Sequence, residues 1–273
     1  MPTSVKIIEF NYNDYMEKLF IKNRHDKKIA VIVEEPAKPI GLAFVMHGFG
    51  GIKSAPHIEI FAKALFDNNY TVVRFDVTHT YGESEGNYED ATTTNYYEDL
   101  EDVINWSKSQ EWYQEPFILC GHSTGGTCTA LYAEKYSEKI KALAPISVMV
   151  SGKLYLRDCN QEEIAEAERT GWQIHESASQ PGLIKKLKWR SYVEDLLKYD
   201  LLPEINKLII PVLLIVGELD NVCPLAHQEI LFKALSSEKK ELHIIKNAPH
   251  TFKEPEHLEE IYRIMDKWLK SIN

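Results

Sequence analysis

The chain has 273 residues, of which 44% are hydrophobic and 26% charged, proportions that are ordinary for a globular protein with a sizeable core. A net charge of −10 argues against nucleic acid or an anionic membrane surface as a partner. The longest apolar run, Leu208 to Val216, is too short to span a bilayer. Residues 1–20 lack the pattern of a signal peptide, and the four cysteines show neither metal-ligand spacing nor a disulfide framework. We therefore expect a cytoplasmic protein without a membrane span, metal or cofactor, whose oligomeric state the sequence does not indicate.

In chain order, the first 150 residues alternate between apolar runs and helix-compatible segments. The run at 40–46 is almost continuously apolar, as expected for a strand covered on both faces. Two earlier strands flank a polar hairpin turn at 23–26. The expected elements are strands at 18–22, 28–33 and 40–46, a helix at 54–68, a strand at 71–75 and a helix at 94–109. This alternation predicts a mostly parallel, doubly wound α/β sheet flanked by helices.

The next strand begins at Phe117 and runs into the sequence GHSTGG at residues 121–126, and a helical segment follows. This is Gly-x-Ser-x-Gly at a strand-to-helix turn, where glycines fit because they lack Cβ. The turn is expected to present the Ser123 hydroxyl at the top of the sheet, near free N–H groups at a helix start. An acyl-transfer nucleophile needs that environment. The structural alternative is a glycine-rich connection that happens to contain a serine.

The pattern breaks between 151 and 206, a segment that is rich in charged and aromatic residues and contains one helical stretch near 161–169. We interpret it as a cap insertion over one end of the sheet, which divides the core into residues 1–150 and 207–273. The alternative is a pair of surface helices whose aromatic side chains turn into the core. Afterwards the alternation resumes with a strand at 211–216, a helix at 225–235, a strand at 241–245 and a closing helix at 256–272.

Catalytic groups of open α/β sheets gather beyond the carboxyl ends of the strands. Asp220 lies just past the strand that follows the insertion, with Glu218 as the alternative acid, and His250 lies just past the last strand. Taken singly, a loop Asp suits a helix N-cap and a loop His suits the surface. The chain order Ser, Asp, His is nevertheless that of a hydrolase elbow. We predict that Ser123 attacks an acyl carbonyl, that His250 transfers the proton, and that Asp220 orients the imidazole.

The segment His-Gly-Phe-Gly-Gly at 47–51 directly follows the apolar run at 40–46. Its glycines allow the backbone to approach a substrate closely. The negative charge that develops on a carbonyl oxygen needs two preset donors, and we predict the backbone N–H groups of Phe49 and Thr124. Residues expected to support this loop and the turn at Ser123 are His47, Gly48, Gly50 and His122.

Four motifs together resemble the α/β-hydrolase family, namely the loop at 47–51, the elbow at 121–126, the acid loop at 217–224 and the histidine loop at 249–252. The resemblance covers about residues 25–272 apart from the insertion. It implies an α/β-hydrolase fold, with a mostly parallel eight-stranded sheet and a small cap. Within the family, the chain is similar to bacterial cinnamoyl/feruloyl esterases and to monoacylglycerol-lipase-like enzymes.

One loop departs from this resemblance. Related enzymes often carry Asp-x-Arg-Gly-x-Gly-x-Ser after the fourth strand, whereas the segment 76–84 has Thr78 and His79 where Arg-Gly is usual. We therefore expect a loop of different shape. His79 could face the pocket, although a surface position is favoured.

The expected function is that of a cofactor-free serine hydrolase that cleaves a small-molecule carboxylic ester with a short-chain or aromatic acyl group. Because the imidazole must be unprotonated to act as a base, activity should fall at acidic pH. One alternative is an amide or thioester hydrolase, and another is a ligand-binding protein that keeps the fold without turnover. A peptidase would need an acidic anchor for the substrate amine; the candidates, whose spacing also suits a solvated helix face, are Glu162, Glu163, Glu166 and Glu168.

Overall fold

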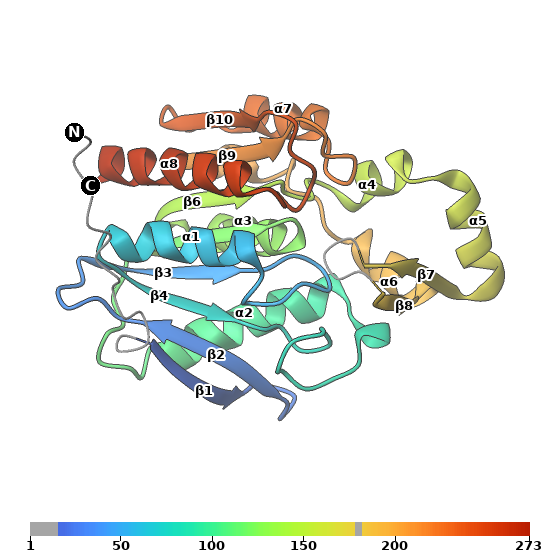
Figure 1. The fold of residues 1–273 in the computed structure, drawn as a ribbon, viewed down its shortest axis with the longest axis horizontal. Helices are drawn as coiled ribbons and strands as arrows, with labels where there is room; N and C mark the ends of the chain where they lie inside the picture. The colour runs from blue at the N-terminus through green and yellow to red at the C-terminus, as the bar shows by residue number, and fades with distance from the viewer. Residues whose placement is uncertain (1–15, 178–181) are drawn as a thin grey trace, which may run out of the picture.

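The computed structural model describes residues 16–177 and 182–273, and an eight-stranded sheet forms its centre (Figure 1). Across the sheet the strands follow the order β1 (Met16–Lys22), β2 (Lys28–Glu34), β4 (Tyr70–Phe75), β3 (Gly41–Met46), β5 (Phe117–His122), β6 (Ile140–Ile146), β9 (Val212–Gly217) and β10 (Lys240–Ile245). The β1–β2 and β2–β4 pairs are antiparallel, and all pairs from β4 to β10 are parallel. The eight-stranded, mostly parallel sheet predicted from the sequence is therefore confirmed.

Helices cover both faces of the sheet (Figure 1). One face carries α1 (Pro56–Asp67) and α8 (Pro255–Ile272), and the other carries α2 (Thr93–Ser107), α3 (Thr124–Lys135) and α7 (Leu225–Ala234). Successive strand residues point to opposite faces, so Val45 packs with α1 and α8 while Phe44 packs with α2 and α3. Because both faces are covered, β3, β4, β5 and β9 are buried along their whole length.

Local sequence determines where two of these helices begin. Pro56 opens α1, at a position where the N–H that proline lacks would have no helical partner. The Thr92 side chain caps α2 by accepting the Asn95 N–H at 3.1 Å. The helices predicted at 54–68 and 94–109 agree with α1 and α2 within two residues at each end. Both helices are thus encoded largely by their own residues.

Residues 151–206, called the insertion below, lie beyond the carboxyl ends of β6 and β9 (Figure 1). They form α4 (Gly152–Asp158), α5 (Gln161–Thr170), an antiparallel hairpin of β7 (Trp172–Glu176) and β8 (Ile184–Lys188), and α6 (Trp189–Leu196). The sequence predicted only α5. The two other helices are too short for propensity to reveal them. The hairpin is obscured because Lys185 is one of the two buried residues of β8, beside Leu187.

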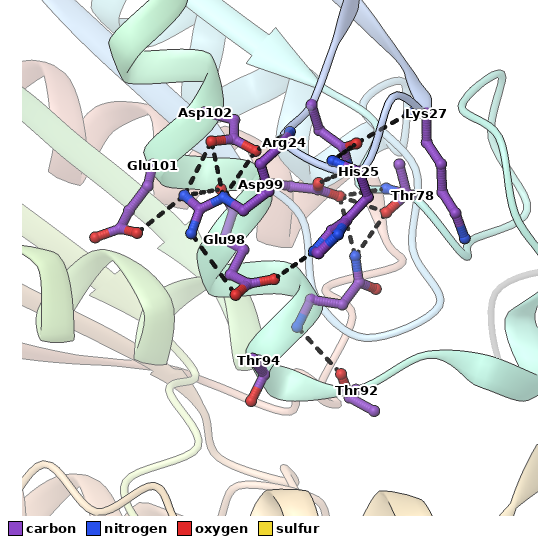
Figure 2. Close-up of polar contacts among 12 residues, drawn as sticks. Arg24, His25, Lys27, Thr78, Thr92, Thr94, Glu98, Asp99, Glu101 and Asp102 are labelled. Atoms are coloured by element: carbon purple, nitrogen blue, oxygen red, sulfur yellow. Dashed lines mark hydrogen bonds and ion pairs between the residues drawn. The ribbon is translucent and has the colours of Figure 1, made fainter.

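A polar network fastens the turn between β1 and β2 to α2 (Figure 2). The buried Asp99 carboxylate accepts hydrogen bonds from Asn23 Nδ2, Thr78 N–H and Thr78 Oγ1, each at 2.7 Å. On the exposed side, Arg24 pairs with Asp102 at 2.9 Å. Thr78 stands where related enzymes often carry arginine, and here it donates to Asp99 through both its backbone N–H and its hydroxyl.

Across residues 16–177 and 182–273, no helix has the length and apolar character needed to cross a membrane. Within the same ranges, no group of three or more His, Cys, Asp and Glu side chains is arranged to hold a metal ion.

Candidate active site

Ser123 occupies a strained turn between β5 and α3. Its φ of 53° and ψ of −122° lie outside the regions that L-residues ordinarily adopt. The neighbouring backbone leaves no room for side chains, because a Cβ on Gly121 would lie 2.7 Å from Gly126 N and a Cβ on Gly125 would lie 2.7 Å from Met46 O. The turn therefore needs the glycines that the Gly-x-Ser-x-Gly pattern supplies, and it brings Ser123 to the carboxyl edge of the sheet.

The loops after β9 and β10 bring Asp220 and His250 together. His250 Nδ1 lies 2.8 Å from Asp220 Oδ2. The other carboxylate oxygen accepts the N–H groups of Val222 and Cys223 at 2.9 and 2.8 Å. With Nδ1–H donated to the carboxylate, His250 Nε2 keeps the lone pair that a general base requires.

Glu218, the alternative acid, is directed elsewhere. Its side chain is exposed, and Oε2 accepts the Asn247 N–H at 2.8 Å. Glu218 thus ties the loop after β9 to the loop after β10. These are the loops that carry Asp220 and His250, so Glu218 helps to hold those two residues close together.

His122 supports the main chain of His250. Its Nε2–H donates to His250 O at 2.8 Å, and the centroids of the two rings are 4.7 Å apart. The ring of His57, from α1, lies 4.5 Å from that of His122. Burial, together with the neighbouring His57, holds the pKa of His122 well below its usual range, and burial lowers the pKa of His57 to about 3. Both rings are therefore neutral, and His57 is a site neighbour that the sequence did not reveal.

The Cys223 thiol lies next to the Ser123 hydroxyl. Cys223 is 1% exposed, and burial raises the pKa of its thiol well above the usual value, so the thiol stays protonated. The structure describes both the turn that carries Ser123 and the loop that carries His250, and no hydrogen bond joins these two residues. Catalytic hydrogen bonds often form only when substrate binds. Cys223 was not among the predicted site residues, although its place three residues after Asp220 was a hint.

His47 anchors the predicted oxyanion loop through both ring nitrogens. Nε2 accepts the Val77 N–H at 3.0 Å, so Nδ1 carries the proton and donates it to Gly48 O at 2.8 Å. Burial lowers the pKa of His47, which keeps the ring neutral and preserves this tautomer. His47 therefore ties the loop after β3 to the end of β4, as a supporting residue should.

The backbone N–H groups of Phe49 and Thr124 are the predicted oxyanion donors. Gly48 O also accepts the Gly51 N–H at 2.9 Å, and because a trans peptide points its N–H opposite to its C=O, Phe49 N–H faces away from that bond. Thr124 is the first residue of α3, so its N–H has no acceptor inside the helix. In the described part of the chain, no hydrogen bond uses either group. A Cβ on Gly48 would lie 2.9 Å from Ser123 Cβ, so the loop approaches the serine closely.

Aromatic rings surround Phe49. Its ring centroid lies 5.2 Å from that of Tyr96, 5.7 Å from that of Tyr88 and 5.0 Å from that of Tyr192 of α6. The Tyr96 hydroxyl also accepts the Gly50 N–H at 2.7 Å. The insertion thus contributes to an apolar wall beside the loop, whose further members include Met149, Trp189 and Cys223.

The other candidates lie apart from this group. His79 lies in the loop after β4, where its Nε2 is 2.6 Å from Lys27 Nζ. The α5 carboxylates considered as amine anchors are all exposed, and Glu166 pairs with Arg169 at 2.6 Å. Both arrangements fit the simpler interpretations, in which His79 belongs to a surface loop and the α5 carboxylates form a solvated helix face.

A mostly parallel sheet with a serine at positive φ between strand and helix, and a His–Asp pair at neighbouring strand ends, defines the class of α/β hydrolases. The family model described as serine aminopeptidase, S33, matches residues 37–169 and 160–256, and the chain belongs to that family. It is a hydrolase family, and the neighbours of this chain include esterases and monoacylglycerol lipases.

Relatives in sequence and structure support this placement. An uncharacterized 31.7 kDa protein from the traX-finO intergenic region of Escherichia coli is 25% identical, covering 84% of this chain and 90% of that protein. A thermostable monoacylglycerol lipase from Bacillus sp. (strain H-257) is 24% identical, covering 78% and 83%. Est1E from Butyrivibrio proteoclasticus, solved with ferulic acid bound, superposes with a TM-score of 0.77 at 21% identity, covering 93% of this chain and 98% of that one.

Proposed function

We propose that the protein is a serine hydrolase that cleaves carboxylic esters through Ser123, His250 and Asp220. The observation that carries this proposal is the His250–Asp220 pair, 2.8 Å apart, in the loops beside a serine held at a φ of 53°. Positive φ is costly for serine and persists where the surrounding structure imposes it, which is typical of functional sites. The relatedness to esterases and a lipase supports ester cleavage over other acyl transfers.

In this mechanism, His250 Nε2 takes the proton from the Ser123 hydroxyl as the oxygen attacks the ester carbonyl. Charge develops on the carbonyl oxygen, where Phe49 N–H and Thr124 N–H would stabilise it. Asp220 holds the imidazole and stabilises the imidazolium that forms. The proton then passes to the departing alcohol, and water releases the acyl group by the same steps in reverse.

The substrate class proposed is an ester with a short-chain or aromatic acyl group. The apolar wall of Phe49, Tyr88 and Tyr192 suits such a group. A groove of about 400 Å³ between α4, α5 and α6 shares Trp189 with this wall. We take the insertion, residues 151–206, to act as the cap of the site.

Labelling with a fluorophosphonate probe tests this function directly, because only an activated serine reacts with it. We expect an adduct on Ser123, located by mass spectrometry, and no adduct on Ser123→Ala. With a short p-nitrophenyl ester, Ser123→Ala should lower kcat by roughly 10⁴-fold or more. Turnover by Ser123→Ala at the wild-type rate would refute the proposal.

Amide hydrolysis is the second candidate, and the description of the family as serine aminopeptidases favours it. A chromogenic proline amide separates the two reactions when its kcat/KM is compared with that of the matched ester. Because the α5 carboxylates are exposed rather than gathered around an amine site, we expect the ester to be cleaved faster. An amide rate equal to the ester rate would reverse this preference.

A further inference from the structure

Lys185 of the insertion is a buried cation beside the oxyanion loop. Lys185 is 8% exposed, and its Nζ donates to Gly50 O at 2.9 Å. The same Nζ lies 5.5 Å and 5.7 Å from the ring centroids of Tyr81 and Tyr88. In the described ranges no carboxylate lies within ion-pair distance of it, and burial lowers its pKa. Burial of an ammonium without an acidic partner costs free energy that the two rings offset only in part.

The carbonyl that Lys185 binds is connected to Phe49 N–H through two peptide groups. Gly50 C=O and Gly51 N–H belong to one planar peptide, and Gly51 N–H donates to Gly48 O at 2.9 Å. Gly48 C=O and Phe49 N–H in turn belong to a second planar peptide. The ammonium therefore stands at one end of a chain of hydrogen bonds that ends on the predicted oxyanion donor. Each bond in such a chain orients and polarises the next.

Gly50 is the residue of this hydrogen-bonded loop whose backbone conformation is least restricted by its own side chain. Its φ is 63°, a left-handed conformation that glycine adopts easily and also leaves easily. The Tyr96 hydroxyl holds the Gly50 N–H at 2.7 Å, and Lys185 holds the Gly50 C=O. With both bonds in place, the two peptides that flank Gly50 are fixed.

We propose that Lys185 is a positioning residue, by which the insertion orients and polarises Phe49 N–H toward the oxyanion of the tetrahedral intermediate. This inference rests on the proposed hydrolase function. Lys185 touches neither Ser123 nor His250 in the structure, and it acts on the reaction through Gly50 and Gly51.

The test compares Lys185→Met with Lys186→Met. Methionine keeps the length and apolar contacts of the lysine stem but removes the donor and the charge. Lys186 is the matched control, because it is exposed on the same strand and its Nζ lies over the Trp172 ring at 3.8 Å. We expect Lys185→Met to lower kcat about 10-fold with little change in KM, since the lost interaction belongs to the transition state.

Two further readouts separate this role from a merely structural one. The affinity for a trifluoromethyl ketone, which forms a tetrahedral oxyanion on the serine, should fall by about the same factor as kcat. The Tm of Lys185→Met should be unchanged or higher, because a buried cation has been replaced by an apolar side chain. Lys186→Met should match the wild type in kcat and inhibitor affinity. A wild-type kcat for Lys185→Met, or a loss of activity matched by a fall in Tm, would overturn the proposal.

Hydrogen–deuterium exchange gives a readout that does not depend on turnover. Exchange in the peptide covering residues 47–53 should be faster in Lys185→Met than in the wild type or Lys186→Met, and unchanged exchange there would count against the role of Lys185. Wild-type protein that fluorophosphonate does not label would instead contradict the hydrolase function. The two failures are therefore distinguishable.

Discussion

His122 contributes to the site through a backbone contact. Its Nε2–H binds His250 O at 2.8 Å, and its position next to Ser123 makes this one bond join the turn of the nucleophile to the loop of the base. Sequence position alone suggested that His122 would be a neighbour of the nucleophile, but only the fold showed that its partner lies 128 residues further along the chain.

Replacing His122 by Phe should keep the ring contacts with His57 and Phe252 while it removes the bond to His250 O. We expect kcat to fall about 10- to 100-fold, because a small displacement of a general base is costly. His57→Phe is the control, since among the described residues the structure gives His57 ring contacts only. Ester kinetics of both variants provide the measurement, and equal rates for the two would show that the hydrogen bond is unimportant.

The candidate site residues that the sequence alone revealed are those that belong to a local sequence motif. Ser123 is marked by glycines whose Cβ atoms would collide with backbone, and Asp220 and His250 by their place after strands. Their catalytic roles remain predictions. Cys223 was marked only by its place three residues after Asp220. His57 and Lys185 carry no such local mark, because each reaches the site through contacts between segments far apart in the chain.

At the scale of elements, α3 carries a half-buried acid, Glu134, in its second half. Burial raises the pKa of Glu134 to about 8, with a smaller contribution from Asp200, and within the described chain Oε1 has no hydrogen-bond partner. The folded protein therefore holds a proton on Glu134 that the unfolded chain, with an ordinary value of 4.5, releases. Stability from this group is complete below pH 4.5 and is lost as the pH rises toward 8.

Glu134→Gln removes this pH dependence, because glutamine resembles the protonated acid. We expect a Tm about 3 °C above that of the wild type at pH 8.5 and no difference at pH 4.5. Thermal unfolding of both proteins at the two pH values is the measurement. A Tm difference that is the same at both pH values would mean that Glu134 does not titrate in this range.

The elements of the core were predictable because each satisfies a local rule. The strands at 40–46 and 117–122 are apolar on both faces, and α1 begins at a proline. The β7–β8 hairpin follows no such rule, since β8 buries a lysine and exposes another. Lys185 of β8 contacts Gly50, which lies far away in the chain, and the local sequence gives no sign of that contact.

At the scale of the molecule, buried and exposed charges contribute differently to the same interface. The carboxylate of Asp99 is 1% exposed and accepts three hydrogen bonds from Asn23 and Thr78, whereas the side chain of Arg24 is 35% exposed. Loss of the buried acceptor leaves donors without partners. When the Arg24 side chain is lost, Glu101 keeps its pair with Lys135, and Asp102 keeps the backbone N–H of residue 24.

Asp99→Ala should therefore lower the free energy of unfolding by about 2–4 kcal/mol, and Arg24→Ala by less than about 1 kcal/mol. Urea denaturation of the two variants and the wild type measures both values. Equal losses would mean that the buried carboxylate does not organise this contact between the β1–β2 turn and α2.

The sequence by itself determined the order and type of the core elements and the fold, because strand burial, helix starts and the Gly-x-Ser-x-Gly turn depend on neighbouring residues. It also nominated Ser123, Asp220 and His250 by position. Tertiary structure decided that Asp220 rather than Glu218 meets His250, that Cys223 lies against Ser123, and that a lysine of the insertion binds the oxyanion loop. These contacts join segments tens to more than a hundred residues apart, and hydrogen bonds over such separations depend on packing geometry that no local pattern encodes.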